Sequence, residues 1–362
     1  MITPQWLRTK GGPTTTVYHL ANQMRTRGHT VEILTSEKDS GVSTFDERLF
    51  VREFQIIRRL LEFRPDVIHI HGRLHFVPSA WIYQALFSPR TRILFTFHTQ
   101  PRYRKYLPDA PEVRKPYTGL QAVPAKFLLH VCDRITSVSK SLVESLNENS
   151  NLGISDYAVI PSGAPTISIN PQEVEQFKGQ HALESCYPIL STVGVFAYDW
   201  KVAGHQIAIE AVKILSRKFP RIKLLIVGDG MYRRYLVEQV KTLGVEENIV
   251  FCGYMDKPEI PVGLSDIYVH MALNESLGIS IVEAMFAAKP IIAANRGGIP
   301  EVITHNETGL LIEPEPSALA RAVEFLVASP AERLRMARNA LSCAEKKLHW
   351  GLIAERYLAL YS

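Results

Sequence analysis

The chain has 362 residues, more than one hydrophobic core usually supports, so two domains are expected. Its 46% apolar and 21% charged residues are ordinary for a globular protein, and neither a signal peptide nor a run of about 18 apolar residues is present, which favours a cytoplasmic protein. The four scattered cysteines argue against disulfides and a zinc site, and the basic excess lies in residues 1–180, with 22 Lys and Arg against 16 Asp and Glu.

Short apolar runs alternate with helical patterns along the chain, which is typical of parallel sheets wrapped by helices. Candidate strands of a first sheet cover residues 31–34, 67–70, 93–96, 134–138 and 157–160. Candidate strands of a second sheet cover residues 189–193, 223–227, 249–252, 267–270, 291–294 and 309–312. A polar stretch that carries Pro, Ser and Gly, residues 161–188, marks the change of domain.

Three histidines accompany strands of the first sheet. His98 directly follows the candidate strand 93–96, and sites in open parallel sheets lie beyond the carboxyl ends of strands, so we expect its ring to face a cleft. His69 and His71 alternate along the preceding strand. They lack a third metal ligand in the sequence, so we favour core or interdomain hydrogen bonding over a metal site.

A basic cluster with interleaved aromatic residues follows His98. Residues 90–140 hold ten Lys and Arg against three Asp and Glu. Such a cluster suits an anionic surface, and because no nucleic-acid motif accompanies it, we favour a membrane or an anionic acceptor. A solvated loop remains the alternative. The residues of this predicted surface are Arg102, Arg104, Lys105, Arg114 and Lys115.

Residues 274–284 set two carboxylates around a junction of loop and helix. Ser276 and Gly278 can leave backbone amides free at the start of the helix, where the helix dipole favours a diphosphate. Glu275 and Glu283 are acceptors suited to sugar and ribose hydroxyls. The segment around Glu283 is apolar on nearly every side, which predicts a mostly buried helix. The alternative is that Glu275 caps the helix and Glu283 is solvated.

These two glutamates, with Lys289 and Pro290 and the segments 297–303 and 306–311, resemble the family 4 retaining glycosyltransferases, which have the GT-B fold. The similarity covers most of the chain, and further motifs follow in family order at residues 11–13, 27–31, 65–71, 96–99 and 225–230. The resemblance implies two Rossmann-like α/β domains whose parallel sheets face each other across a cleft. The implied divisions are an acceptor-side domain 1–165, a nucleotide-sugar-binding domain 166–347, and a last helix 348–362 that packs back on the first domain.

The resemblance further implies a hexosyltransferase that moves a sugar from a nucleoside-diphosphate-sugar donor to a glycan or lipid-linked acceptor, with no cofactor, protein nucleophile or nucleic-acid partner. Its catalytic residues would be His98 and Glu275, with Glu283 at the ribose. No Asp-x-Asp motif is present, so no metal is implied. An anionic membrane surface is a further implied partner, with the enzyme peripheral on its cytoplasmic face. The remaining donor-binding residues would be Gly11, Gly12, Lys201, Ser276, Leu277, Gly278 and Ile279.

The sequence departs from the family pattern in the second domain. The family carries Gly-Arg and Lys-Gly pairs that neutralise the diphosphate, but here Val195 follows the first glycine and Ala203 precedes the second. Lys201 is close enough in sequence to supply a replacement cation. A catalytically silent homologue and a sugar-nucleotide epimerase therefore stay as alternatives. A dinucleotide dehydrogenase is disfavoured because residues 227–233 lack the third glycine of GxGxxG.

A second departure is at the start of the chain. Family members open with a buried strand, whereas residues 1–6 leave room for only the end of one. Either Met1 is an internal residue of a longer gene product, or the first domain lacks a central strand and is less stable than the second.

Overall fold

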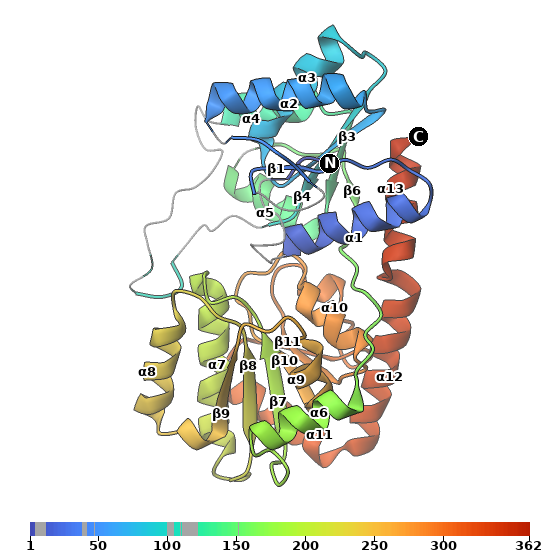
Figure 1. The fold of residues 1–362 in the computed structure, drawn as a ribbon. Helices are drawn as coiled ribbons and strands as arrows, with labels where there is room; N and C mark the ends of the chain where they lie inside the picture. The colour runs from blue at the N-terminus through green and yellow to red at the C-terminus, as the bar shows by residue number, and fades with distance from the viewer. Residues whose placement is uncertain are drawn as a thin grey trace. The chain divides into compact units, whose positions relative to one another are not determined.

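The chain forms two compact units in the computed structural model (Figure 1). The first unit comprises Met1–Tyr103, Arg114–Gly163 and Trp350–Ser362, and the second comprises Arg104–Val113 and Ala164–His349. The structure describes residues 1–3, 12–37, 42–46, 48–99, 105–108, 110, 122–150 and 152–362.

The first unit is built on parallel strands. A four-stranded sheet has the order β3-β4-β5-β6, and β1 pairs with β2 beside it. The strands are β1 (Leu34–Thr35), β2 (Ser43–Thr44), β3 (Val67–His71), β4 (Arg92–Phe97), β5 (Arg134–Ser137) and β6 (Ala158–Val159). The helices are α1 (Gly12–Thr26), α2 (Leu49–Phe63), η1 (Leu74–Phe76), α3 (Val77–Leu86), α4 (Ala122–His130), α5 (Lys140–Ser150) and α13 (Trp350–Tyr361).

The first residues of the chain lie between β1 and β3. Ile2 bridges Leu34 on one side and Ile70 on the other. The Ile2 amide donates to the His69 carbonyl at 2.8 Å, and the His71 amide donates to the Ile2 carbonyl at 2.9 Å. These bonds join the β1–β2 pair to the four-stranded sheet through the short extended segment 1–3.

The second unit contains a six-stranded parallel sheet of order β12-β11-β10-β7-β8-β9. Its strands are β7 (Ile189–Val193), β8 (Lys223–Val227), β9 (Ile249–Gly253), β10 (Ile267–His270), β11 (Ile291–Ala294) and β12 (Leu310–Ile312). Its helices are α6 (Pro171–Gln180), α7 (Asp199–Leu215), α8 (Arg233–Leu243), η3 (Glu246–Asn248), α9 (Glu259–Leu264), α10 (Ile279–Phe286), η4 (Ile299–Glu301), α11 (Pro316–Ala328) and α12 (Pro330–Lys347). The predicted α/β class with parallel sheets in two units is confirmed.

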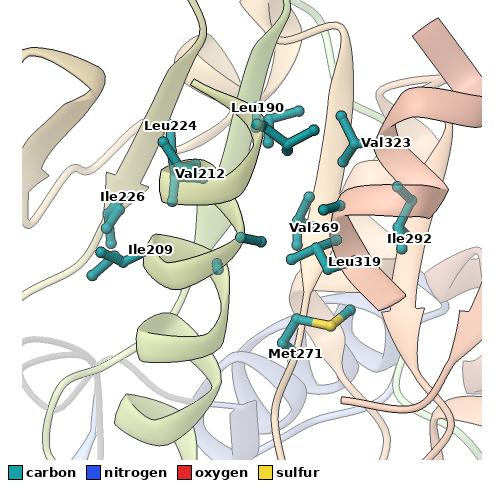
Figure 2. Packing of buried hydrophobic residues seen from close by; sticks show 14 of the residues in the cluster. Leu190, Ile209, Val212, Leu224, Ile226, Val269, Met271, Ile292, Leu319 and Val323 are labelled. Carbon is teal, nitrogen blue, oxygen red and sulfur yellow. The ribbon is translucent and has the colours of Figure 1, made fainter. Parts of the chain in front are cut away.

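Successive strand residues of the second unit point to opposite faces of the sheet, and both faces are covered by helices. Ile189 and Leu225 pack with Phe177 of α6, and the partly buried Ile260 of α9 packs against the same cluster. The opposite face packs on α7 and α11 (Figure 2), and full burial of each such aliphatic side chain contributes about 1.5–3 kcal/mol. Figure 2 labels the sheet residues Leu190, Leu224, Ile226, Val269 and Ile292, Met271 directly after β10, and the helix residues Ile209, Val212, Leu319 and Val323.

The unit boundaries fall at residues 163/164 and 349/350, against predicted domain boundaries at 165/166 and 347/348. The described residues 105–108 and 110 group with the second unit. Leu107 and Ala110 join the core of the second unit, and the Tyr106 amide donates to the Asp199 carboxylate at 2.9 Å.

No helix in the described part of the chain has the length and apolar character needed to cross a membrane.

Candidate functional site

Three charged or titratable side chains of the second unit meet where β10 ends and α7 begins. Lys201 lies in the first turn of α7, His270 is the last residue of β10, and Glu275 lies in the loop that follows. The Lys201 ammonium Nζ is 3.4 Å from Oε2 of Glu275, and Nε2 of His270 is 3.3 Å from the same oxygen. We call Lys201, His270 and Glu275 the ionic cluster.

The ionic cluster holds Glu275 in its charged form. Burial alone would raise the pKa of this carboxyl, but the positive charge of Lys201 and the hydrogen bond from His270 lower its pKa from 4.5 to about 2. The Glu275 side chain is 12% exposed and that of Lys201 is 27% exposed. The cluster is therefore an ion pair with limited contact with solvent.

Two glycines allow the backbone around the ionic cluster to pack closely. A Cβ on Gly297 would lie 2.2 Å from the Glu275 carbonyl oxygen, which itself accepts a hydrogen bond from the Gly298 amide at 2.9 Å. A Cβ on Gly204 would lie 2.5 Å from the Met271 carbonyl oxygen. Side chains at these two positions would push Glu275 and α7 away from their observed places.

Helix α10 starts directly after Glu275 and is mostly buried, as the sequence predicts. Gly278 is its N-cap residue, with a φ of 93° and no side-chain cap. The first amides of an α-helix have no acceptor within the helix, so this end can bind an anion. The predicted donor-binding residues Ser276, Leu277 and Ile279 lie at this helix start.

Glu283 lies on α10, and its side-chain carboxyl makes no hydrogen bond or ion pair with any residue in the described ranges. Burial, together with the charge of Glu259, raises the pKa of its carboxyl from 4.5 to about 7. Its anion is therefore poorly stabilised in the free protein, and a group that donates hydrogen bonds would stabilise it.

The sequence did not predict two histidines of this site. His270 and His205 line a hollow at the carboxyl ends of β7 and β10 together with Lys201 and Gly194. Burial, with the charges of His270 and Lys201, lowers the pKa of His205 to about 3. Two patterns could have indicated them. His270 ends the candidate strand 267–270, and His205 directly follows Gly204, which is the glycine of the family's Lys-Gly pair.

Ala203, at the position where the family carries lysine, is buried in the apolar core of the second unit. The cation of this region is instead Lys201, two residues earlier, on the first turn of α7. The structure thus brings together two of the predicted site residues, Lys201 and Glu275, through a direct ion pair.

A second polar cluster lies in the first unit at the carboxyl ends of β3 and β4. Nδ1 of His71 is 2.8 Å from Nε2 of His98. The ring of His69 is bonded on both sides, by the Tyr361 hydroxyl to Nδ1 at 2.7 Å and by the Thr96 hydroxyl to Nε2 at 2.6 Å. We call these five residues the histidine cluster.

Two further predicted site residues are described by the structure. Gly12 is the first residue of α1, and Lys105 is exposed. The described residues contain no group of three or more His, Cys, Asp or Glu side chains that could hold a metal ion. Gly11 and four residues of the predicted anionic-surface cluster lie outside the described residues, namely Arg102, Arg104, Arg114 and Lys115.

Two family models match the chain in succession. The model described as Glycosyltransferase Family 4 matches residues 10–166, and the model described as Glycosyl transferases group 1 matches residues 173–342. N-acetyl-alpha-D-glucosaminyl L-malate synthase of Bacillus anthracis is 24% identical over 328 residues, which are 84% of this chain and 81% of that protein. The 2-deoxystreptamine glucosyltransferase of Streptomyces kanamyceticus is 32% identical over 165 residues, 44% of this chain and 42% of the relative.

Solved structures share the fold over nearly the whole length. A glycosyltransferase from Rickettsia africae has a TM-score of 0.79 at 20% identity and covers 99% of this chain and 97% of its own. Anabaena HepE in complex with UDP-glucose has a TM-score of 0.77 at 17% identity, with 99% and 98% covered. The family matches in both units and this likeness confirm the resemblance seen in the sequence: the chain belongs to the GT4-type glycosyltransferases, glycosyl transferases group 1, and has the GT-B fold.

Proposed function

We propose that this glycosyltransferase moves a hexose-type sugar, with retention of configuration, from a nucleoside-diphosphate sugar to a glycan or lipid-linked acceptor. The observation that carries the proposal is the arrangement around the start of α10. Glu275 is held as a charged, oriented carboxylate, while Glu283 is a half-buried carboxyl without a side-chain partner among the described residues. Between them lies a helix N-terminus suited to a diphosphate.

The proposed donor would use the two carboxylates differently. Both contacts of the Glu275 carboxylate are made by Oε2, which leaves acceptor capacity on Oε1 for sugar hydroxyls. Ribose hydroxyls would donate to Glu283 and replace the stabilisation that its anion lacks in the free protein. UDP-glucose bound to the structural neighbour HepE supports this class of donor.

In the proposed reaction the acceptor attacks from the face of the sugar that the diphosphate leaves, and a diphosphate oxygen helps to deprotonate it. The group that gains negative charge is then the leaving diphosphate. Lys201 and the amides at the start of α10 would stabilise that charge, which is the largest kind of contribution available to such a site. Lys201 would thus serve both Glu275 and the diphosphate.

Calorimetry with a panel of nucleoside-diphosphate sugars, beginning with UDP-glucose, tests the donor site. Replacing Glu283 with Ala should weaken donor binding by about 1–3 kcal/mol, because hydrogen bonds to a charged acceptor are lost. Glu238→Ala, an exposed substitution on α8, is the matched control. Unchanged affinity in the Glu283 variant would remove this residue from the site, and donor binding without transfer to any acceptor would favour the silent homologue.

For the acceptor we propose a lipid-linked molecule reached at an anionic membrane surface. Three exposed apolar side chains share one side of α2: Phe50 is 86% exposed, Phe54 68% and Leu61 39%. Neighbouring Trp81 of α3 and Phe127 of α4 form an exposed edge-to-face pair with ring centroids 5.6 Å apart. Residues 48–92, which include α2 and α3, hold eight arginines against three acidic residues. Apolar side chains flanked by arginines suit an anionic bilayer interface.

Vesicle flotation separates this acceptor from a soluble glycan. The full chain should float with vesicles that contain phosphatidylglycerol and less with pure phosphatidylcholine, and binding should fade as salt rises above physiological strength. Replacing Phe50 and Phe54 with Ser should abolish flotation. Phe325→Ser removes a phenylalanine that is 46% exposed from α11 of the second unit and should have no effect. Flotation that ignores lipid charge, or that survives the double substitution, would favour a soluble glycan.

A further inference from the structure

The contact between His71 and His98 limits which nitrogen of each ring carries the proton. Burial lowers the pKa of His98 to about 3 and keeps the pKa of His71 well below its usual range, so both rings are neutral at physiological pH. A neutral imidazole has one N–H and one lone pair. Across the 2.8 Å contact between Nδ1 of His71 and Nε2 of His98, one nitrogen must donate and the other accept.

The far side of the His71 ring distinguishes the two possibilities. Its Nε2 is buried and has no hydrogen-bond partner among the described residues. If Nδ1 of His71 accepted, the ring proton would sit on this Nε2 as a buried, unpaired donor. If Nδ1 donates, Nε2 carries a lone pair instead. Buried N–H groups without an acceptor are rarer in folded proteins than under-satisfied buried acceptors, so the geometry favours donation by His71.

Strands and stacking fix the orientation of both rings. His71 is the last residue of β3 and pairs in register with Thr96 of β4, two residues before His98. The His69 ring packs behind that of His71 with centroids 3.9 Å apart, and His69 is itself held at both nitrogens. His71 is completely buried and His98 is 6% exposed, so neither ring has room to turn freely.

We propose that His71 is a positioning residue for His98: its Nδ1–H donates to Nε2 of His98, which places the ring proton of His98 on Nδ1 as a donor to a hydroxyl of the transferred sugar. The part that involves the sugar rests on the proposed function. The part that involves the two rings does not, because it concerns the free protein.

Two nearly isosteric substitutions test the direction of the hydrogen bond. Asn can donate from a side-chain nitrogen at about the place of the imidazole Nδ1, whereas ionised Asp can only accept. His71→Asn should therefore preserve the Nδ1–H form of His98. His71→Asp should move the ring proton of His98 to Nε2 or protonate the ring fully, since a carboxylate in this position favours an N–H that points at it.

The primary measurement is ¹⁵N NMR of the histidine rings in the full chain without donor, with His98→Gln used to assign the His98 signals. We expect the pattern of a neutral Nδ1–H ring for His98 in the unchanged protein and in His71→Asn, and a different pattern in His71→Asp. A neutral Nε2–H ring in the unchanged protein would overturn the proposal. So would the same pattern in both variants.

Transfer kinetics give the second readout. The turnover number should fall about tenfold or more in His71→Asp, with little change in the donor KM, and should be largely retained in His71→Asn. Equal losses in both variants, in parallel with their melting temperatures, would reduce His71 to a structural residue. If no protein in the series transfers sugar, the proposed function fails, while the NMR result still decides the positioning of His98.

Discussion

The two polar clusters occupy corresponding places, at the carboxyl ends of parallel strands, but one consists of neutral side chains and the other contains an ion pair. In the histidine cluster of the first unit, His69 and His71 are neutral because burial keeps the pKa of each ring well below its usual range, and hydroxyl groups and other rings are their partners. In the ionic cluster of the second unit, an ammonium lies 3.4 Å from a carboxylate. Both arrangements pair polar groups away from solvent, although Nε2 of His71 stays without a partner among the described residues, and only the second arrangement depends on charge.

This difference indicates what each unit can recognise. A neutral cluster suits uncharged hydroxyl groups and keeps its hydrogen bonds over a wide pH range. A charged cluster next to a helix N-terminus and an unpartnered carboxyl suits a ligand with both an anionic diphosphate and hydroxyl donors. The stability effects of substitutions at Glu283 and in the ionic cluster should therefore depend on pH, and those of uncharged substitutions in the histidine cluster should not.

The largest effect should come from Glu283, through the stability of the free protein. Its pKa is raised from 4.5 to about 7, so the folded state favours the protonated carboxyl. This contribution to stability is fully present below pH 4.5 and is lost as the pH rises through 7. Glu283→Gln removes the titration, and the variant should be more stable than the unchanged protein at pH 8 by roughly 3 kcal/mol, at 1.36 kcal/mol for each pKa unit.

Melting temperatures at pH 4.5 and pH 8 measure this difference. The gain of the Gln variant should be present at pH 8 and nearly absent at pH 4.5. Glu238→Gln, at an exposed position of α8, should show no such pattern. An equal gain at both pH values would mean that the carboxyl of Glu283 is not destabilised as an anion, and would weaken its assignment to the donor site.

Glu275→Gln should have the next largest effect, on transfer. The amide keeps the shape of the side chain but leaves Lys201 without its counter-charge and weakens the hydrogen bond from His270. We expect kcat/KM for the donor to fall about 30-fold, equivalent to about 2 kcal/mol, as is typical when one member of a partly buried charge pair is lost. A change of less than about threefold would separate the ionic cluster from sugar recognition.

The sheets could be predicted from the sequence because local patterns determine them. Each candidate strand of the second sheet overlaps an observed strand, since a strand buried on both faces needs a continuous apolar run. The short strand β2 at Ser43–Thr44 was not predicted, because two polar residues carry no such pattern. The buried character of α10 followed from the apolar residues around Glu283 in the same way.

The contacts that define the two clusters could not be predicted, because they depend on where distant elements meet. Lys201 reaches Glu275 only because α7 begins at Asp199, so that Lys201 lies in its first turn, and the length of the preceding loop does not reveal this. His71 meets His98 through the register of β3 and β4. Residues 105–108 and 110 group with the second unit, where the Tyr106 amide donates to Asp199, 93 positions later in the sequence.

Lys201→Met should have an intermediate effect that separates its two proposed tasks. If the ammonium also serves the diphosphate, affinity for a nucleoside diphosphate should fall about tenfold while affinity for the bare nucleoside stays unchanged. Lys241→Met on α8, with 58% of its side chain exposed, is the control. If only the affinity for the complete nucleotide sugar falls, Lys201 acts through Glu275 alone.

The smallest effect should come from Tyr361→Phe in the histidine cluster. Its dependence on pH tests whether this cluster is neutral, in contrast to the ionic cluster. The substitution removes the hydroxyl that is 2.7 Å from Nδ1 of His69, and loss of one neutral hydrogen bond costs about 1 kcal/mol. Burial keeps the pKa of His69 well below its usual range and raises the pKa of Tyr361 well above 10, so neither partner changes charge between pH 6 and pH 9. The difference in melting temperature between the variant and the unchanged protein should therefore be the same at both ends of that range. A difference that grows toward pH 6 would mean that His69 gains a proton in the folded protein, and the first unit would then hold charge as the second does.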